Sequence, residues 1–254
     1  MALLEVKQLT KHFGGLTAVG DVTLELNEGE LVGLIGPNGA GKTTLFNLLT
    51  GVYEPSEGTV TLDGHLLNGK QPYKIAALGL GRTFQNIRLF KDLTVLDNVL
   101  IAFSNHHKQH VFASFLRLPA FYKNEKELKA KALELLKIFD LDGDAETLAK
   151  NLAYGQQRRL EIVRALATEP KILFLDEPAA GMNPQETAEL TALIRRIKDE
   201  FNITIMLIEH DMNLVMEVTE RIYVLEYGRL IAHGTPDEIK SNKRVIEAYL
   251  GGEA

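Results

Sequence analysis

The sequence predicts an α/β fold with an N-terminal antiparallel β-subdomain and an inserted α-helical subdomain. Three observations predict it. Apolar runs alternate with helical patterns, short early runs alternate apolar with polar residues, and the middle of the chain shows no convincing strand. We expect residues 1–87 and 168–254 to form the α/β core with its β-subdomain, and residues 88–167 to form the helical subdomain.

Near the start of the chain, three short runs alternate apolar and polar residues. They are Leu4–Val6, Val22–Leu26 and Thr59–Leu62. A period of two gives a strand one solvated face and one buried face. These runs therefore predict an antiparallel sheet.

Three other runs are apolar on both faces, which is typical of strands buried in a parallel sheet. They are Leu31–Ile35, Ile172–Leu175 and Ile203–Ile208. Between the last two, a helical spacing of apolar residues predicts a right-handed crossover. Its members are Leu190, Leu193, Ile194 and Ile197. Near the end, Ile222–Leu225 and Leu230–Ala232 predict a hairpin that turns at Tyr227-Gly228.

Two amphipathic helices are expected in the middle of the chain. One is marked by Leu128, Ala132, Leu135 and Phe139, and the other by Leu160, Val163 and Ala167. The charges of alternating sign over Lys123–Lys137 fit the solvated face of the first helix.

The composition excludes several classes of protein. The chain has 254 residues, 45% of them hydrophobic and 24% charged, as in folded domains. A formal charge of −6 argues against a general nucleic-acid coat. The sequence contains no Cys, so disulfides, zinc–thiolate sites and thiol nucleophiles are excluded. No run approaches about 18 apolar residues, so no membrane span is expected, and residues 1–10 are too short and polar for a signal peptide.

A phosphate-binding pattern, G-x-x-x-x-G-K-[S/T], follows the buried strand and opens a helical pattern that Gly51 can cap. The expected nucleotide contacts are Gly36, Pro37, Asn38, Gly39, Ala40, Gly41, Lys42, Thr43 and Thr44. Bare backbone N–H groups and the helix amino end suit phosphate oxygens. Lys42 can reach the β- and γ-phosphates, and the Thr43 hydroxyl can bind Mg²⁺. The alternative, a glycine-rich turn, is weakened by the strand before it and the helix after it.

A second site is expected where the strand Ile172–Leu175 ends in Asp176 and Glu177. Ligands of open α/β sheets lie at the carboxyl ends of the strands. Asp176 is therefore expected to hold Mg²⁺ beside the phosphate loop, and Glu177 to polarise a water for in-line attack on the γ-phosphate. The alternative is an acidic helix N-cap, with Pro178 ending the strand.

These motifs resemble those of the nucleotide-binding subunit of an ATP-binding-cassette (ABC) transporter, over nearly the whole chain. The resemblance implies the ABC ATPase fold, in which the α/β core is a RecA-like P-loop NTPase domain. It also implies further functional positions: Phe13 stacking on adenine, Gln85 contacting Mg²⁺ and water, His210 as the switch histidine, and Ala153, Tyr154, Gly155 and Gln156 in the signature. The alternative for Phe13 is a core aromatic near the sheet. For His210 the alternative is a satisfied histidine at a strand end, which its place after a fourth apolar strand disfavours.

The resemblance implies catalysis by Glu177, His210 and Gln85, with ATP and Mg²⁺ bound and the metal held by Thr43, Gln85 and Asp176. It further implies that the signature of one subunit completes the ATP site of a second, so that two subunits sandwich two ATP molecules. Hydrolysis then opens the dimer.

Two positions depart from the common family pattern. The usual signature is Leu-Ser-Gly-Gly-Gln, but Ala153 and Tyr154 replace Ser and Gly here. Ala153 lacks the hydroxyl that contacts the γ-phosphate, so the N–H of Gly155 and the helix amino end must carry more of that contact. The loop after Glu177 ends in Asn183 instead of Asp. Both changes bear on catalytic rate more than on ATP binding.

Three segments together resemble the branched-chain amino-acid importers, of the high-affinity Leu/Ile/Val uptake type. They are Leu152–Glu161, Asp176–Pro184 and Ile208–Met212, and the aromatic-rich insert after Asn98 also fits. The resemblance implies a peripheral subunit on the cytoplasmic side of the inner membrane. Its implied partners are a second ATPase subunit (homodimer or heterodimer), two transmembrane permease subunits and, indirectly, a periplasmic solute-binding protein, with no nucleic acid.

Other assignments remain open: an ATPase for amide, urea or lipid-related substrates, a non-transport ABC ATPase acting on DNA or ribosomes, and a regulatory module. The non-transport class typically carries a coiled coil, a zinc module or two cassettes, which this sequence lacks. The presence of Asp176, Glu177 and His210 disfavours a catalytically dead module.

The stretch from Phe84 to Phe121 is rich in aromatic residues. It contains Phe84, Phe90, Phe103, Phe112, Phe115 and Phe121. Most are expected in the core of the helical subdomain, and some could line a groove for a helix of the membrane partner. The histidines of His106–His110 have no acidic or Cys neighbours and fit a solvated turn better than a metal site.

Overall fold

The computed structural model describes residues 2–103 and 119–250 and divides into two compact units. The first is formed by the chain up to Arg82 and from Lys171 onward, and the second is Thr83–Pro170. The second unit starts and ends a few residues outside the expected range of 88–167. Phe112, Phe115 and His106–His110 lie outside the described residues, as does the side chain of Phe121.

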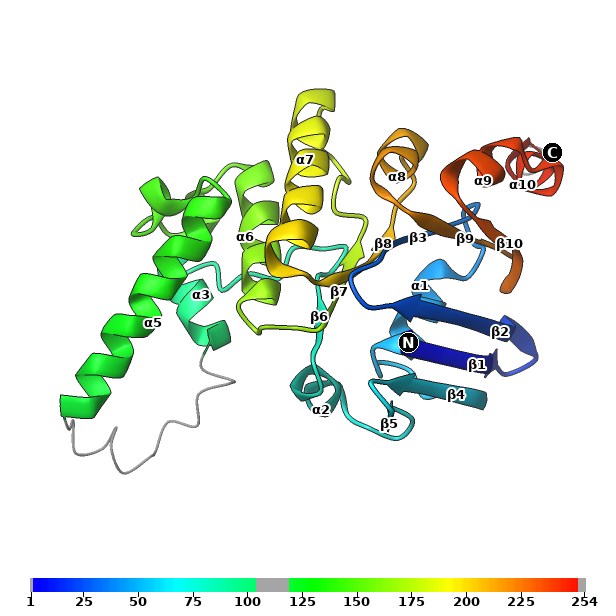
Figure 1. Ribbon diagram of the computed structural model, residues 1–254, viewed down its shortest axis with the longest axis horizontal. Coiled ribbons are helices and arrows are strands. Elements are labelled where there is room, and N and C mark those ends of the chain that lie inside the picture. Colours follow the sequence, from blue (N-terminus) through cyan, green and yellow to red (C-terminus); the bar gives the residue numbers. More distant parts are fainter. Residues whose placement is uncertain (1, 104–118, 251–254) are drawn as a thin grey trace. The chain divides into compact units, whose positions relative to one another are not determined.

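A four-stranded antiparallel sheet opens the first unit, in the order β2-β1-β4-β5 (Figure 1). Its strands are β1 (Ala2–Phe13), β2 (Leu16–Asn27), β4 (Glu57–Leu62) and β5 (His65–Leu66). The three alternating runs all lie in it, so the predicted antiparallel sheet is confirmed. Strands β1 and β2 are longer than those runs, because register shifts interrupt the alternation along them.

The second sheet has six strands in the order β10-β9-β3-β8-β7-β6. Its strands are β3 (Leu31–Ile35), β6 (Leu80–Arg82), β7 (Ile172–Asp176), β8 (Thr204–Ile208), β9 (Arg221–Glu226) and β10 (Arg229–Gly234). The buried runs pair in parallel as predicted, and β9 and β10 form the predicted hairpin. Strand β9 also pairs in parallel with β3, which joins the hairpin to the same sheet. Strand β6 was not predicted, since three residues are too few to show a period.

Both faces of this sheet are covered, which explains its continuous apolar strands. On one face, Val32, Leu34 and Phe174 join the core with helix α1 (Lys42–Leu49) and the antiparallel sheet. On the other face, Ile35 and Val224 pack with the C-terminal helices. Figure 1 shows α7 and α8 on the opposite side of the sheet from α1.

Helices α7, α8, α9 and α10 belong to the first unit, together with the short helix α2. Their bounds are α2 (Pro72–Ala77), α7 (Pro184–Phe201), α8 (Met212–Val218), α9 (Pro236–Ser241) and α10 (Lys243–Leu250). Helix α7 buries Leu190, Leu193, Ile194 and Ile197. The predicted crossover helix is therefore confirmed.

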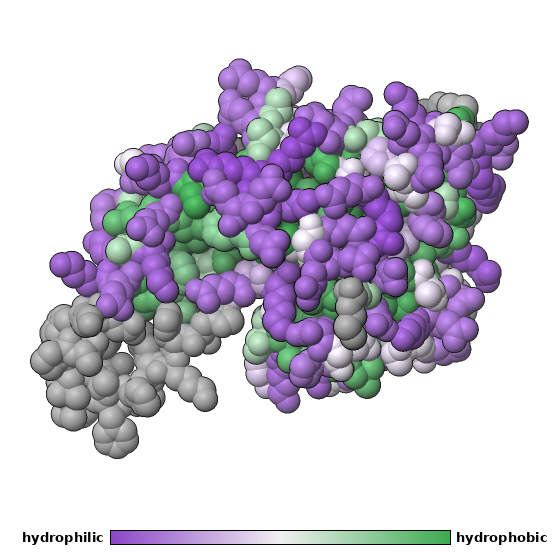
Figure 2. Space-filling view, in the orientation of Figure 1, coloured by the Kyte–Doolittle hydropathy of each residue, from purple (hydrophilic) through white to green (hydrophobic). Residues whose placement is uncertain are grey.

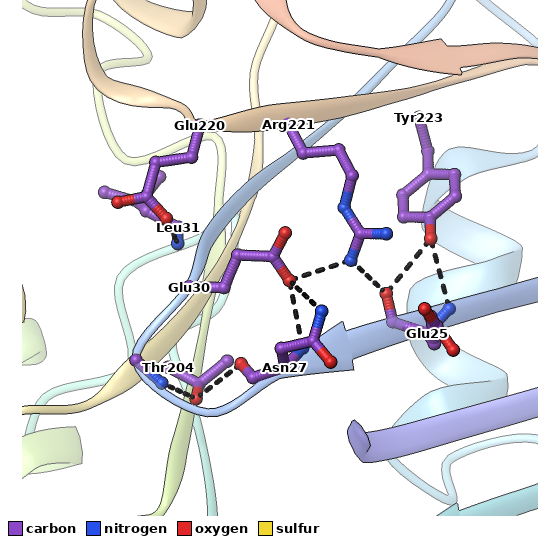
Figure 3. Close-up of polar contacts among 9 residues, drawn as sticks. Glu25, Asn27, Glu30, Leu31, Thr204, Glu220, Arg221 and Tyr223 are labelled. Atoms are coloured by element: carbon purple, nitrogen blue, oxygen red, sulfur yellow. Dashed lines mark hydrogen bonds and ion pairs between the residues drawn. The ribbon is translucent and has the colours of Figure 1, made fainter. Parts of the chain in front are cut away.

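A polar cluster links the two sheets near the amino end of β3 (Figure 3). The Arg221 guanidinium donates to the Glu30 carboxylate at 2.7 Å and to the Glu25 carbonyl at 2.8 Å. The Tyr223 hydroxyl donates to the same Glu25 carbonyl at 3.0 Å. The Thr204 hydroxyl bridges the turn between β2 and β3, accepting from Gly29 N–H at 2.9 Å and donating to the Asn27 carbonyl at 3.2 Å. This cluster lies at the opposite end of β3 from the phosphate loop.

The second unit is helical. It contains α3 (Val95–Phe103), α5 (Pro119–Ile138), α6 (Tyr154–Leu166) and the 3₁₀ turns η1 (Asp142–Asp144) and η2 (Ala149–Asn151). Both predicted amphipathic helices are present, and Phe139 and Ala167 lie just beyond their ends. Asn98 is fully buried, and hydrogen bonds satisfy its polar atoms. Its amide donates to the Phe90 and Thr94 carbonyls and accepts from Phe90 N–H. Phe103 is buried and Phe90 is exposed.

Within residues 2–103 and 119–250, no helix has both the length and the apolar character needed to cross a bilayer. The face seen in Figure 2 is predominantly hydrophilic, with smaller hydrophobic areas between the polar side chains.

Candidate nucleotide-binding site

The phosphate loop connects β3 to helix α1 with three glycines at positive φ. At Gly36, an added Cβ would stand 2.0 Å from the Leu225 carbonyl oxygen, so no side chain fits. At Gly41, which precedes α1, φ is 99° and a Cβ would meet the Ala18 carbonyl at 2.6 Å. No side chain caps the amino end of α1. Its first-turn N–H groups are therefore available to an anion.

Lys42 lies in the first turn of α1 and is buried, with 6% of its surface exposed. Its ammonium donates to the Gly36 carbonyl at 2.6 Å and to the Pro37 carbonyl at 3.0 Å. Among the residues that the structure describes, no carboxylate lies within 4.0 Å of it. Burial lowers the pKa of Lys42, and the nearby charge of Glu177 partly opposes this. A buried cation without a close counter-ion suits a polyphosphate ligand.

Glu177 and His210 contact each other across neighbouring strands. Glu177 follows β7 and His210 follows β8, and the two strands are paired in the sheet. The His210 Nε2 atom lies 2.7 Å from the Glu177 Oε1 atom, with the Glu177 side chain 12% exposed and that of His210 45% exposed. Glu177 has a φ of 48°, in the left-handed region that costs a non-glycine residue about 1–3 kcal/mol. Strained residues of this kind often occur at functional sites.

His210 also lines a cavity of about 380 Å³ beside the phosphate loop. The other lining residues are Gly36, Pro37, Asn38, Ala40, Glu226, Tyr227, Ala248 and Tyr249. The structure therefore brings together the phosphate loop, the ammonium of Lys42, the carboxylate of Glu177 and the imidazole of His210.

Asp176 ends β7 and is almost fully buried. The Arg82 guanidinium, from the neighbouring strand β6, lies 3.5 Å from its carboxylate. Arg82 also donates to the Thr50 hydroxyl at 2.6 Å and lies 4.9 Å from the centre of the Phe46 ring. Asp176 is thus held by a charged neighbour that the sequence patterns did not indicate.

Phe13 ends β1 and is 43% exposed, so it is not the core aromatic of the alternative interpretation. Its ring meets the edge of Tyr53 at a centroid distance of 5.4 Å, and the Lys11 ammonium lies 5.3 Å from its centre. An exposed ring of this kind can stack on a planar base.

Asn183, at the end of the loop after Glu177, caps helix α7. Its side chain accepts from Glu186 N–H at 3.0 Å, and the Glu186 carboxylate accepts from Asn183 N–H at 2.9 Å. The alternative interpretation of Asp176 and Glu177 is an acidic cap for the following helix. Asn183 supplies that cap instead, so Asp176 and Glu177 are left for other roles.

The remaining predicted positions, Gln85 and the signature residues Ala153–Gln156, lie in the second unit. There a buried ion pair on α6 holds the backbone next to Gln85. The Arg158 guanidinium donates to the Phe84 carbonyl at 2.7 Å, to the Gln85 carbonyl at 2.8 Å and to the Glu161 carboxylate at 2.8 Å. Glu161 in turn accepts from the N–H groups of Phe84 at 3.3 Å and Arg88 at 3.2 Å. Burial raises the pKa of Glu161 despite these donors.

The signature begins helix α6. Ala153 stands at the N-cap and has no side-chain oxygen, so the first-turn N–H groups of α6 receive no side-chain cap. The Gln156 side chain accepts from Ala153 N–H at 3.1 Å and donates to Asp144 at 2.8 Å. Ala153 and Tyr154 are exposed. A helix amino end open in this way can accept an anion.

The residues present fit ATP with Mg²⁺. Mg²⁺ in nucleotide sites usually takes one or two protein oxygens together with phosphate oxygens and water. The carboxylate of Asp176 and the exposed hydroxyl-bearing Thr43 are oxygen ligands of that type. In the part of the chain that the structure describes, no three His, Cys, Asp or Glu side chains gather as a separate metal site.

Sequence patterns did not identify three residues that contact predicted site positions or their backbone, namely Arg82 and Glu209 in the first unit and Arg158 in the second. Arg158 and Glu161 stand at i and i+3 on a helix, and this spacing could have indicated their pairing. Glu209 immediately follows the buried strand β8, where an acidic residue is unusual. Arg82 gives no such signal, because its partner Asp176 is distant in the sequence.

Comparison with known proteins agrees with this geometry. The family model of ABC transporters matches residues 19–180, and a model described as branched-chain amino acid ATP-binding cassette transporter matches residues 229–254. The chain therefore belongs to the ABC transporter family.

Individual relatives are similar over nearly the whole chain. The high-affinity branched-chain amino acid transport ATP-binding protein LivG of Salmonella typhimurium is 52% identical, over 98% of both chains. The protein BraF of Pseudomonas aeruginosa, with the same description, is 50% identical over the same shares.

A solved ATP-binding cassette of an ABC transporter in its ADP conformation is 32% identical, with a TM-score of 0.85 over 99% of both chains. A dimeric bacterial ABC transporter cassette is 27% identical, with a TM-score of 0.78 over 92% of this chain and 98% of that one. These similarities confirm the predicted ABC ATPase fold.

Proposed function

We propose that this chain binds and hydrolyses ATP as the energising subunit of an ABC importer for branched-chain amino acids. The observation that carries the ATPase function is the 2.7 Å contact between His210 Nε2 and Glu177 Oε1 beside the phosphate loop. The solute is inferred from the similarity to LivG and BraF, whose descriptions name branched-chain amino acid transport.

Each residue of the site has a defined role in this proposal. The glycine-rich loop and the amino end of α1 bind the phosphates, and Lys42 neutralises the β- and γ-phosphates. Phe13 stacks on the adenine. Thr43, Asp176 and Gln85 would hold Mg²⁺, which would supply positive charge to stabilise the phosphate oxygens.

Glu177 accepts the proton of the attacking water, and His210 orients Glu177 by its contact with the carboxylate. The signature residues Ala153–Gln156 of a second subunit complete the site with the amino end of α6. Two copies of this chain, or this chain and a related subunit, thus enclose ATP between them. Hydrolysis weakens the bridge and opens the pair, which drives the attached membrane subunits.

The subunit is proposed to act on the cytoplasmic side of the inner membrane as a peripheral protein. Two transmembrane permease subunits are its direct partners, and a periplasmic solute-binding protein acts on them from the other side. Transport of amides, urea or lipids is the alternative, because the ATPase site itself does not contact the solute.

The ATPase function is tested with the purified chain. Lys42→Ala is expected to abolish ATP binding measured by calorimetry, and Glu177→Gln to retain binding while turnover falls by at least about 100-fold. Unchanged ATP affinity in Lys42→Ala would contradict the assignment of the phosphate loop.

The solute is tested in cells of the source organism that lack the chain. Wild type is expected to restore uptake of labelled leucine and Glu177→Gln to leave it absent. Restored uptake of urea with unchanged leucine uptake would favour the alternative.

A further inference from the structure

Glu209 is a buried acid next to the candidate catalytic pair, and none of the roles above uses it. It follows strand β8 directly, precedes His210 and is 4% exposed. A carboxylate buried to this extent is costly unless several donors satisfy its oxygens. Burial raises the pKa of Glu209, and hydrogen bonds from the backbone oppose that shift.

The two oxygens of Glu209 serve two different loops. Its Oε1 atom accepts from Ala179 N–H at 2.7 Å, in the loop after β7. Its Oε2 atom accepts from His210 N–H at 3.1 Å, in the loop after β8. The backbone of Asp211 supplies a further hydrogen bond to the same carboxylate. One side chain therefore fixes the spacing between the two loops.

These loops carry Glu177 and His210. Glu177 is tied to β8 by its own N–H, which donates to the Ile208 carbonyl at 2.9 Å, and its carbonyl accepts from Ala180 N–H at 3.1 Å. The contact between His210 and Glu177, together with the two bonds of Glu209, closes a ring that joins the side chains and backbones of both loops. If the Glu209 bonds are lost, the imidazole and the carboxylate are held only by their direct contact and by the bond from Glu177 N–H to the Ile208 carbonyl.

We propose that Glu209 is a positioning residue for ATP hydrolysis, which holds the loops after β7 and β8 at the spacing that His210 and Glu177 require. This inference rests on the proposed ATPase function. It assigns Glu209 no contact with ATP, so its effect must pass through His210 and Glu177.

The test compares steady-state ATP hydrolysis by wild type, Glu209→Gln and Glu209→Ala. Glutamine keeps the length of the side chain but has only one acceptor oxygen, so one of the two loops must lose its bond. The expected kcat falls about 10-fold for Glu209→Gln and about 100-fold for Glu209→Ala, since small misplacements of catalytic groups reduce rates by such factors. KM for ATP is expected to stay within about twofold, because the phosphate loop is untouched.

The matched control is Glu30→Gln. The Glu30 side chain is also largely buried, at 14% exposed, and its carboxylate also accepts from a backbone N–H, that of Asn27 at 2.9 Å. It lies at the opposite end of β3, in the cluster of Figure 3. This variant is expected to keep the wild-type kcat and KM.

A double-mutant cycle separates positioning from general structural support. If Glu209 acts through His210, adding Glu209→Gln to His210→Ala is expected to change kcat by less than about twofold. A purely structural role predicts that the two losses multiply, and that result would overturn the proposal. Wild-type kcat in Glu209→Gln, or a KM that rises while kcat stays constant, would overturn it as well.

A fallback variant and a comparison with Glu177→Gln distinguish failure of the Glu209 proposal from failure of the proposed ATPase function. If Glu209→Ala does not fold, Glu209→Asp, which keeps the charge but is too short to reach both loops, is expected to show the 10-fold loss of kcat. A wild-type chain without ATPase activity contradicts the proposed function itself. An active wild type, an inactive Glu177→Gln and a normal Glu209→Gln contradict only the role of Glu209.

Discussion

The buried pair of Arg158 and Glu161 gives a sharp stability prediction for the second unit. Both side chains are almost fully excluded from water, at 0% and 5% exposed, with their charged atoms 2.8 Å apart. The change Glu161→Leu leaves the Arg158 charge buried without its partner. Removal of one partner from such a pair costs about 3–5 kcal/mol in the free energy of unfolding.

Replacing both partners, as Arg158→Met with Glu161→Leu, removes the charge problem. Both variants lose the two hydrogen bonds that Glu161 accepts from the N–H groups of Phe84 and Arg88. The double variant also loses the two bonds from Arg158 to the carbonyls of Phe84 and Gln85, at about 1 kcal/mol each. Beyond the two bonds that both variants lose, the double variant is thus expected to lose about 2 kcal/mol, against about 3–5 kcal/mol for the unpaired charge in the single variant. It should be more stable than the single variant by about 1–3 kcal/mol.

The assay is urea unfolding followed by circular dichroism, since the chain has no Trp. Amide hydrogen exchange over Thr83–Pro170 locates the loss in the second unit. A single variant within about 1 kcal/mol of wild type, or a double variant less stable than the single one, would refute this reasoning.

Three further predictions concern the signature, the polar cluster and pH. Ala153→Ser supplies the missing hydroxyl and is expected to raise ATP turnover by up to about 10-fold at unchanged ATP affinity. Equal turnover in Ala153→Ser and wild type would show that the hydroxyl does not contribute to hydrolysis in this chain. Tyr223→Phe removes the hydroxyl bonded to the Glu25 backbone and should lower the free energy of unfolding by about 1 kcal/mol in thermal unfolding. The neutral control is Tyr227→Phe, at a residue that is 84% exposed. The pKa of Glu161 is raised in the folded protein, so the folded state binds this proton more tightly than the unfolded state does. The free energy of unfolding of wild type, relative to Glu161→Gln, should therefore fall as pH rises from about 4.5 through the pKa of Glu161 in the folded protein. A stability difference that rises over that range would contradict the direction of the shift.

Much of the fold could be predicted because its strands show clear periods. The both-face apolar runs Leu31–Ile35 and Ile203–Ile208 are strands of one parallel sheet, and the alternating runs form the antiparallel one. Strand β6 could not be predicted, since its three residues acquire their strand conformation from pairing with β7. The parallel pairing of β9 with β3 is likewise a long-range contact without a local signal.

The candidate site likewise has features that the sequence could predict and contacts that it could not. The phosphate loop is a continuous motif, with a steric reason for Gly36 and Gly41 and a positive φ of 76° at Gly39, so the sequence alone indicates it. Contacts such as Arg82 with Asp176, or Glu209 with Ala179, join residues that are distant in the sequence. Single-sequence patterns carry no information on such pairs, although a charge directly after a buried strand, as at Glu209, is an unusual feature that could have drawn attention.

The proposed ATP site is shared by two subunits, and cysteine crosslinking tests this sharing most directly. The natural chain has no Cys, and both Asn38 in the phosphate loop and Ala153 in the signature are exposed. We expect a Glu177→Gln chain carrying Asn38→Cys and Ala153→Cys to form a disulfide-linked dimer under mild oxidation with ATP and Mg²⁺, but not without nucleotide. Equal crosslinking with and without ATP, or a chain that stays monomeric with ATP bound, would contradict it.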